Sequence, residues 1–517
     1  MQLLLAPSYL LWMLLNLLLL FTCVAAWAPA QQTFATEVQP QAVAPPPLEV
    51  RPLFLSGPTG NRVDLVFLAD GYLSSEKDKF FADALFLAED ISANQTYNTV
   101  RPLLNFWAAF TPSRESGVGK GGRTKDTVFG LYRDGTELRG VWCNNTDIAR
   151  AACESLGDGC DYPITVGNDP LYGGSGGYPT VITASPANGP QILRHELGHS
   201  IIDVGDEYDG GASWGYFGVN AAQNASRSPP WSHWLTNPSN ATRVEHSVMP
   251  LQQYTWTMLN TSSSWTTTFI SSGTFSKYAL FFSVSGIPNT ADLTIKVDGQ
   301  TLPWEVRSNI GADRWLYDLN FNRGLSGGRH TLEYRLNNKT LEGTAQLCSV
   351  EINEFGSEAE FISKPGHYGL YPVYSDKNTT TYRPTNEDCL MRKVTTPNFC
   401  SVCKEDLWLH LLQRVDLIDN FAASCRTGSR FLTATVVPFG RFRQPEDRKA
   451  GEEYTFQWFK NGVRQMQFDG MVEVNTGSGT AGVGRWAFRA ALKTDEVRRD
   501  PEGLLTNERQ IKVTAIC

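Results

Sequence analysis

Three features are scarce in this sequence of 517 residues: long apolar runs, excess positive charge and nucleotide-binding motifs. No stretch after residue 30 is apolar for long enough to cross a bilayer. Lys and Arg number 45 against 53 Asp and Glu, a net charge of −8, which excludes the electrostatic footprint of a nucleic-acid-binding protein. The glycine-rich stretch 171–177 lacks the Gly-Lys-Ser/Thr ending of a phosphate loop, and no helix follows it directly.

The one long apolar run lies at the start of the chain. Residues 10–21 are largely apolar and small residues follow at 24–26 and 28–30, a pattern typical of a secretory signal peptide. The usual positive charge before the run is missing, so a retained signal anchor is the alternative. We interpret residues 1–28 as the signal peptide and residues 29–50, rich in Gln, Ala and Pro, as a linker or propeptide remnant. The protein is therefore expected to be secreted and extracellular.

Sequons and cysteines agree with secretion. One of the ten cysteines, Cys23, leaves with the signal, and most of the remaining nine are expected to form disulfides in an oxidising compartment. Cys400-x-x-Cys403 has no second pair at matching spacing, so we interpret these two as disulfide partners rather than a redox or second zinc site. Asn-x-Ser/Thr sequons, which predict a glycoprotein, occur at Asn94, Asn144, Asn224, Asn240, Asn260, Asn338 and Asn378.

The length predicts about two to four domains. A buried strand at 63–69 followed by a helix at 77–91 starts an α/β region, which continues with strands at 105–110, 127–132 and 180–184 and helices at 147–156 and 404–420. Short alternating segments between Gly, Asn and Asp turns predict two β-sandwiches. The expected organisation is a catalytic domain in two parts, 51–254 and 356–425, with an inserted β-sandwich at 255–355 and a C-terminal β-sandwich at 426–517.

The run His195-Glu196-Leu197-Gly198-His199 carries metal-binding chemistry. On a helix, His195 and His199 lie one turn apart on the same face and can direct both imidazoles to one ion. Glu196 then lies beside that ion, where the H-E-x-x-H pattern makes it the base that takes a proton from zinc-bound water. A chance match on an exposed helix is the alternative.

A zinc ion needs a third protein ligand and an open position for water. Gly205 can end the helix in a left-handed conformation and turn the chain back, so we predict that Asp206 is this ligand, with Asp203 and Glu207 as alternatives. Before the motif, residues 172–184 contain a glycine-rich loop and a strand. They fit an exposed edge strand that binds substrate backbone, and a plain surface loop is the other interpretation.

Matching segments occur in a fixed order at residues 61–72, 172–177, 195–208, 382–384, 389–391 and 399–403. Together they resemble the IgA peptidases, a family of secreted zinc metallopeptidases among the metzincin-like zincins. The resemblance implies an α/β (α+β) metzincin-like catalytic domain in which His195, His199 and Asp206 bind zinc and Glu196 is the general base. It also implies a methionine turn beneath the metal, for which Met391 is the better candidate and Met249 the second.

The third ligand departs from the H-E-x-x-H-x-x-G-x-x-H pattern of ordinary metzincins, but a carboxylate is an acceptable zinc ligand. The expected function is that of a secreted zinc-dependent metalloendopeptidase acting on extracellular proteins or peptides, with Tyr208, His246 and Tyr382 as candidate oxyanion stabilisers. The alternative is a secreted adhesin that binds glycan or protein through its β-sandwiches and carries a vestigial peptidase site.

Overall fold

The computed structural model describes residues 43–517, except 94–95, 136, 212–215, 239–242 and 378. The predicted signal peptide 1–28 and residues 29–42 of the predicted linker lie outside the described residues. The end of that predicted linker already belongs to the first strand, which begins at Glu49. Among the described helices, none has the length and apolar character that crossing a membrane requires.

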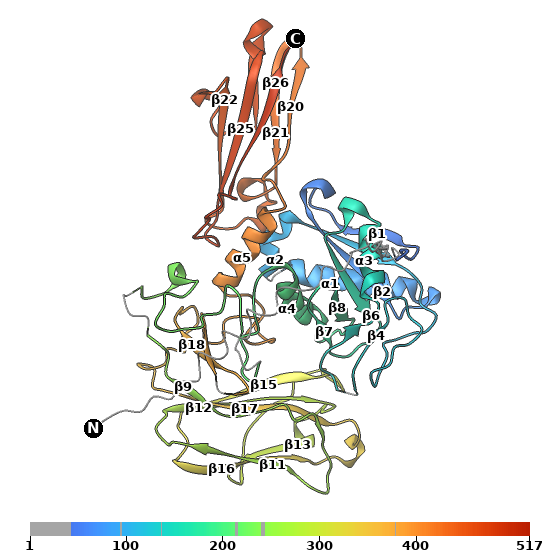
Figure 1. Cartoon of the computed structure of the whole chain (residues 1–517), viewed down its shortest axis with the longest axis vertical. Coiled ribbons are helices and arrows are strands. Elements are labelled where there is room, and N and C mark those ends of the chain that lie inside the picture. The colour runs from blue at the N-terminus through green and yellow to red at the C-terminus, as the bar shows by residue number, and fades with distance from the viewer. Residues whose placement is uncertain (1–42, 94–95, 136, 212–215, 239–242, 378) are drawn as a thin grey trace, which may run out of the picture. The chain divides into compact units, whose positions relative to one another are not determined.

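A six-stranded sheet with the order β1-β3-β2-β6-β8-β7 organises the first part of the chain (Figure 1). The four inner strands are parallel and the two edge strands run antiparallel to their neighbours. The strands are β1 (Glu49–Phe54), β2 (Val63–Asp70), β3 (Leu104–Phe110), β6 (Tyr162–Gly167), β7 (Gly174–Ser175) and β8 (Thr180–Thr183).

Helices cover both faces of this sheet, which explains why β2 is buried at every residue. Leu65 and Phe67 pack in the same core as α1 and α4, whereas Val66 and Leu68 pack in a separate cluster with α3. The alternation of side chains along the strand produces these two cores. The helices are α1 (Lys77–Ala93), α2 (Thr96–Val100), α3 (Thr146–Glu154), α4 (Gly189–Ile201) and α5 (Ser401–Leu412).

Two predicted elements differ from the structure. The predicted strand at 127–132 is reduced to β4 (Leu131–Tyr132), which pairs with β5 (Trp142–Cys143). The Thr127 hydroxyl and the Phe129 amide before it instead donate hydrogen bonds to the buried Asp70 carboxylate. The predicted helix at 404–420 is wrong in its second half. Helix α5 ends at Leu412 and strand β20 begins at Ile418, inside the predicted catalytic part.

A first pair of sheets follows the helix α4 region and encloses its own apolar core (Figure 1). One sheet has the order β10-β17-β12-β15 with β9 also on β17, and the other has the order β11-β16-β13-β14. Its strands begin at Ser247, before the predicted start at 255. They are β9 (Ser247–Gln253), β10 (Thr257–Met258), β11 (Trp265–Ser271), β12 (Lys277–Ser285), β13 (Leu293–Val297), β14 (Gln300–Thr301), β15 (Trp315–Phe321), β16 (Gly328–Leu336) and β17 (Gln346–Phe355).

The chain then returns to the helical region through a two-stranded hairpin, β18 (Tyr371–Tyr374) and β19 (Thr380–Arg383), and through α5. A second pair of sheets, β20-β21-β24 and β23-β22-β25-β26, packs around the buried Trp458 and Trp486. Its strands are β20 (Ile418–Arg426), β21 (Ser429–Val436), β22 (Glu453–Lys460), β23 (Val463–Arg464), β24 (Glu473–Ser478), β25 (Gly484–Lys493) and β26 (Thr506–Val513). The protein is thus a mixed α/β structure with many sheets and few helices.

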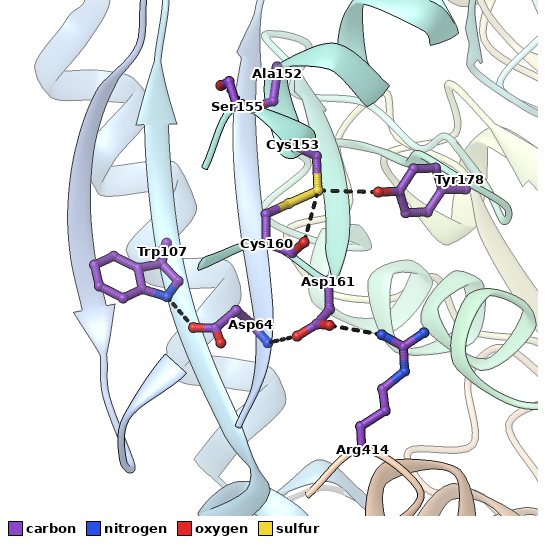
Figure 2. Close-up of a disulfide and its surroundings, with 9 residues drawn as sticks. All are labelled: Asp64, Trp107, Ala152, Cys153, Ser155, Cys160, Asp161, Tyr178 and Arg414. Atoms are coloured by element: carbon purple, nitrogen blue, oxygen red, sulfur yellow. Dashed lines mark hydrogen bonds and ion pairs between the residues drawn. A yellow bond between two sulfur atoms is a disulfide. The ribbon is translucent and has the colours of Figure 1, made fainter. Parts of the chain in front are cut away.

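The disulfide between Cys153 and Cys160 joins the end of α3 to the start of β6 (Figure 2). Asp161, the next residue, accepts hydrogen bonds at 2.8 Å from the Asp64 amide and at 2.8 Å from the Arg414 guanidinium. The turn held by the disulfide is therefore fastened to β2 and to the segment that follows α5.

A second disulfide joins Cys425 to Cys517, but the other cysteines of the described residues are free. The prediction that most of the cysteines pair is therefore wrong, and so is the predicted pairing of Cys400 with Cys403. Two of the free cysteines lie in unrelated sheets, and the other three lie together around the start of α5. The free cysteines are Cys143 in β5, Cys348 in β17, and Cys389, Cys400 and Cys403.

Candidate active site

Helix α4 positions the predicted motif beneath the edge of the six-stranded sheet. Pro190 lies in its first turn, where a missing N–H costs no hydrogen bond. Leu193, Leu197 and Ile201 face the apolar core. The polar side chains of the motif lie on the other face and line a cavity of about 790 Å³.

Three candidate ligand atoms converge on one point beside this helix. The Nε2 atoms of His195 and His199 each lie 3.1 Å from Oδ1 of Asp206. The Nδ1 atom of His195 lies 3.2 Å from the Leu390 carbonyl oxygen, and that of His199 lies 3.1 Å from the Val204 carbonyl oxygen. Carbonyl oxygens only accept, so both Nδ1 atoms carry the hydrogen and both Nε2 atoms are left to face Asp206.

Asp206 reaches this point by a route that differs from the prediction. Helix α4 ends at Ile201, and Gly205 does not have the left-handed conformation that the sequence led us to expect. The side chain of Asn220 instead accepts from the Gly205 amide at 3.0 Å and donates to its carbonyl at 2.9 Å. Glycine is needed at 205 for space, because a Cβ there would lie 2.4 Å from the Phe217 carbonyl oxygen.

The two alternative ligands lie elsewhere. The side chain of Asp203 is exposed, and this residue is not part of the converging group. Glu207 is buried and its Oε1 accepts a hydrogen bond of 2.8 Å from Asn220, while burial raises the pKa of its carboxyl well above the usual range. Asn220 thus holds both Gly205 and Glu207, a role for which the sequence carries no signal.

The candidate methionine turn lies against α4. The Lys393 amide donates to the Cys389 carbonyl at 3.0 Å and closes a tight turn that contains Met391. A Cβ on Gly198 would lie 3.3 Å from the Met391 sulfur, so the helix approaches this turn closely. Met249, the second candidate, belongs to strand β9 of the inserted sheets.

Edge strand β7 lies beside Glu196 and His199, because its glycines allow close approach. A Cβ on Gly174 would lie 2.7 Å from the Ile192 side chain, and one on Gly176 would lie 2.7 Å from the His199 Cβ. An edge strand before the motif is therefore present, but it is half-buried rather than exposed and only two residues long. Burial raises the pKa of Glu196, while the nearby histidines act in the opposite direction.

The charges of the converging group stabilise one another. Burial lowers the pKa of His195, but the hydrogen bond and charge of Asp206 raise it more, to about 9. Burial raises the pKa of Asp206, but the two imidazoles hold it well below its usual range. The Tyr208 hydroxyl donates to Oδ2 of Asp206 at 2.7 Å and leaves Oδ1 for the histidines.

The cavity has walls that the sequence did not indicate. Tyr172, Tyr254 and Trp256 line it together with Arg314, whose guanidinium lies 4.7 Å from the Tyr172 ring and 4.9 Å from the Trp256 ring. These residues come from the loop before β7 and from the inserted sheets. Because these residues are far apart along the chain, no sequence motif could have identified them as neighbours.

The three candidate oxyanion stabilisers do not lie together. Tyr208 lines the cavity, but its hydroxyl already donates to Asp206. His246 stacks on Phe275, and neither it nor Tyr382 is among the residues that line the cavity. Of the three residues, only Tyr208 therefore belongs to the site.

Comparison with known proteins identifies the segment that carries this site. Residues 52–252 match the family described as IgA Peptidase M64, which confirms the resemblance found in the sequence and indicates a peptidase. No curated protein matches.

Two solved structures share little with the chain. A GH2 beta-galacturonidase from Eisenbergiella tayi has 9% identity over 48% of this chain and 34% of its own, with a TM-score of 0.13. A beta-glucosidase from Kluyveromyces marxianus has 10% identity over 69% and 59%, with a TM-score of 0.15. This chain thus spans less than two thirds of either protein, and at these TM-scores neither bears on its function.

Proposed function

Since residues 52–252 belong to the IgA peptidase M64 family, we propose that this protein is a secreted, zinc-dependent metalloendopeptidase of metzincin-like fold that cleaves extracellular proteins or peptides. The observation that carries the proposal is the convergence of His195 Nε2, His199 Nε2 and Asp206 Oδ1 at distances of 3.1 Å. Two imidazole nitrogens and one carboxylate oxygen are a donor set of the kind found in catalytic zinc sites.

The surroundings fit a metal with an open position. Both imidazoles are held at Nδ1 by backbone carbonyls, and Asp206 is held at Oδ2 by Tyr208, so each ligand atom is oriented by a second contact. All three residues also line the cavity, which leaves space for water and substrate. A zinc ion held here would lower the pKa of a bound water and polarise the scissile carbonyl.

Glu196 is the proposed general base. It follows His195 directly, lines the same cavity, and has a pKa raised by burial, which favours a carboxylate that can take up a proton. We assign to it the removal of a proton from the attacking water and the later transfer of that proton to the leaving amine. The water oxygen adds to the scissile carbonyl carbon, and the carbon–nitrogen bond then breaks as the leaving amine takes up that proton, which leaves a carboxylate and a free amine.

Substrate binding is assigned to the edge strand and to the opposite walls. Among the described strands, β7 pairs with β8 alone, and we assign its other side to pairing with an extended peptide. Tyr254, Trp256 and Arg314 from the inserted sheets face the same cavity and would contact side chains of a bound peptide. Glycan binding by either pair of sheets, glycosylation, and secretion directed by residues 1–28 remain predictions from the sequence.

Cleavage of casein by the full chain, with and without a chelator, tests the proposal. We expect chelator-sensitive cleavage that zinc restores. The variant Glu196→Gln should retain zinc and lose activity by about 10²- to 10⁴-fold, the usual contribution of a general base. Glu502→Gln, at an exposed position in the C-terminal region, is the matched control and should cleave normally.

Two outcomes would contradict the proposal. Undiminished cleavage by Glu196→Gln would exclude Glu196 as the base. A wild-type protein that binds zinc at His195 and cleaves neither casein nor a mixed peptide library would favour the adhesin with a vestigial site.

A further inference from the structure

A second group of metal-binding atoms lies outside the cavity, where three free cysteines meet. Cys389, Cys400 and Cys403 are all buried, and their sulfur atoms lie within 4.8 Å of one another. The sulfur of Cys403 is 3.7 Å from that of Cys389 and 3.8 Å from that of Cys400. The proposed peptidase mechanism uses none of these thiols.

These separations are those of a thiolate metal site. In a tetrahedral zinc site with Zn–S bonds of about 2.3 Å, the sulfur ligands are about 3.8 Å apart. The backbone supports such a site, because the Cys400 amide donates to the Cys389 sulfur at 3.4 Å and Cys400 caps the start of α5. A helix start stabilises negative charge, which favours a thiolate at Cys400, the residue at the N-cap of α5.

A disulfide accounts less well for the group. Three cysteines cannot all be paired with one another, so one buried thiol would remain in contact with the bond. The other free cysteines of the described chain, Cys143 and Cys348, lie in separate sheets and do not belong to the group. A single metal ion, by contrast, can bind all three sulfur atoms.

We propose that Cys389, Cys400 and Cys403 form a second, structural metal site for a thiophilic ion, zinc in the first place, in which the sulfur atoms of Cys389 and Cys400 lie 3.7 Å and 3.8 Å from that of Cys403. A small ligand such as water completes the coordination. The proposal does not depend on the peptidase function, because it involves different residues.

The position of the three cysteines indicates which part of the fold a bound metal would stabilise. The Leu390 amide donates to the Asn398 carbonyl at 2.9 Å, which closes the loop between Cys389 and Cys400. The same Leu390 accepts from His195, and Met391 and Phe399 approach Gly198 of helix α4. A metal on the three cysteines would therefore hold the loop that supports the first candidate site.

Counting zinc in the full-length protein, purified without reductant, tests the inference. The variant Asp206→Ala removes the first site, so it should keep one zinc per chain if the cysteine site exists. Adding Cys400→Ser to that variant should remove the remaining zinc. Adding Cys348→Ser instead, which deletes a buried free thiol of the inserted sheets, should leave it bound.

A spectroscopic measurement covers the case in which the cysteine variants fail to fold. Cobalt added to the chelator-treated Asp206→Ala protein should give thiolate-to-cobalt charge-transfer absorption, and zinc should abolish it. Absence of that absorption overturns the proposal. So does peptide mapping of the non-reduced protein that finds a disulfide among Cys389, Cys400 and Cys403, or three alkylatable thiols and no metal.

Discussion

The two candidate metal groups of this molecule bring three ligand atoms together in opposite surroundings. His195, His199 and Asp206 supply nitrogen and oxygen atoms at the wall of a cavity. The cysteine group supplies only sulfur and is closed off from solvent. Catalytic zinc sites keep an open position for water, whereas structural sites are closed and rich in thiolates. The donor atoms and the solvent access therefore favour a catalytic role for the histidine–aspartate group and a structural role for the cysteine group.

The groups are also linked by one loop. Cys389 precedes Leu390, whose carbonyl oxygen orients His195, and Met391, which packs on the same helix. The buried cysteine group thus supports the loop that contacts the open histidine–aspartate group. The comparison predicts that damage to the first group removes activity, and that damage to the second lowers stability more than it lowers activity.

Replacing one metal ligand in each group should distinguish the two roles most clearly. Asp206→Ala should lower peptidase activity by more than 100-fold, because residues that only orient a metal ligand are already worth about 10- to 100-fold and Asp206 would bind the metal itself. Cys403→Ser should lower the midpoint of thermal unfolding and keep a measurable part of the activity. Casein cleavage and thermal unfolding of both variants check this. Equal loss of activity in both would break the distinction.

A smaller effect is expected from the hydroxyl that orients Asp206. Tyr208→Phe removes the 2.7 Å hydrogen bond to Oδ2, and we expect zinc affinity at the first group to fall by about 10- to 100-fold. Competition with a chromophoric chelator measures the affinity. Tyr178→Phe, at an exposed tyrosine that does not line the cavity, is the control and should bind zinc normally. Unchanged zinc affinity in Tyr208→Phe would show that this hydroxyl does not orient Asp206 for the metal.

The histidine–aspartate group should be sensitive to a larger side chain next to edge strand β7. In Gly176→Ala the new Cβ would lie 2.7 Å from the His199 Cβ, and overpacking of this kind costs about 1–3 kcal/mol. We expect weaker zinc binding and slower cleavage, measured together. Gly60→Ala, where nothing lies within 4 Å of the new Cβ, should behave as the wild type. A fully active Gly176→Ala protein would place β7 farther from the helix.

A further effect concerns the pH dependence of stability in the metal-free protein. Because Asp206 raises the pKa of His195 from 6.5 to about 9, the folded state holds this proton more tightly than the unfolded state. The resulting stabilisation is complete below pH 6.5 and is lost as the pH rises through about 9. The unfolding midpoint of chelator-treated protein should fall across this window.

Two controls belong to that measurement. The zinc form should show no such fall, since the metal replaces the proton. The variant His195→Gln should also be insensitive, and a flat profile in the metal-free wild type would contradict the pairing of His195 with Asp206.

Much of the first group could be predicted from the sequence, because helical spacing is a local property. The four-residue step from His195 to His199 determines a shared face on any helix. The buried strand at 63–69 was predictable for a similar reason, since a continuous apolar run suits a strand covered on both sides. The error at 404–420 arose where a helical pattern ran into strand β20, whose pairing with β21 is a non-local contact.

What the sequence determined by itself was the helix, its histidines and glutamate, and the nearness of Asp206, all within a short span of chain. Tertiary structure alone decided how Asp206 is delivered, because Asn220 rather than a left-handed Gly205 holds that loop. It also gathered the cavity walls from distant segments, and it brought the three cysteines of the segment 389–403 to one point. Such contacts depend on packing between elements, which no spacing along a single chain encodes.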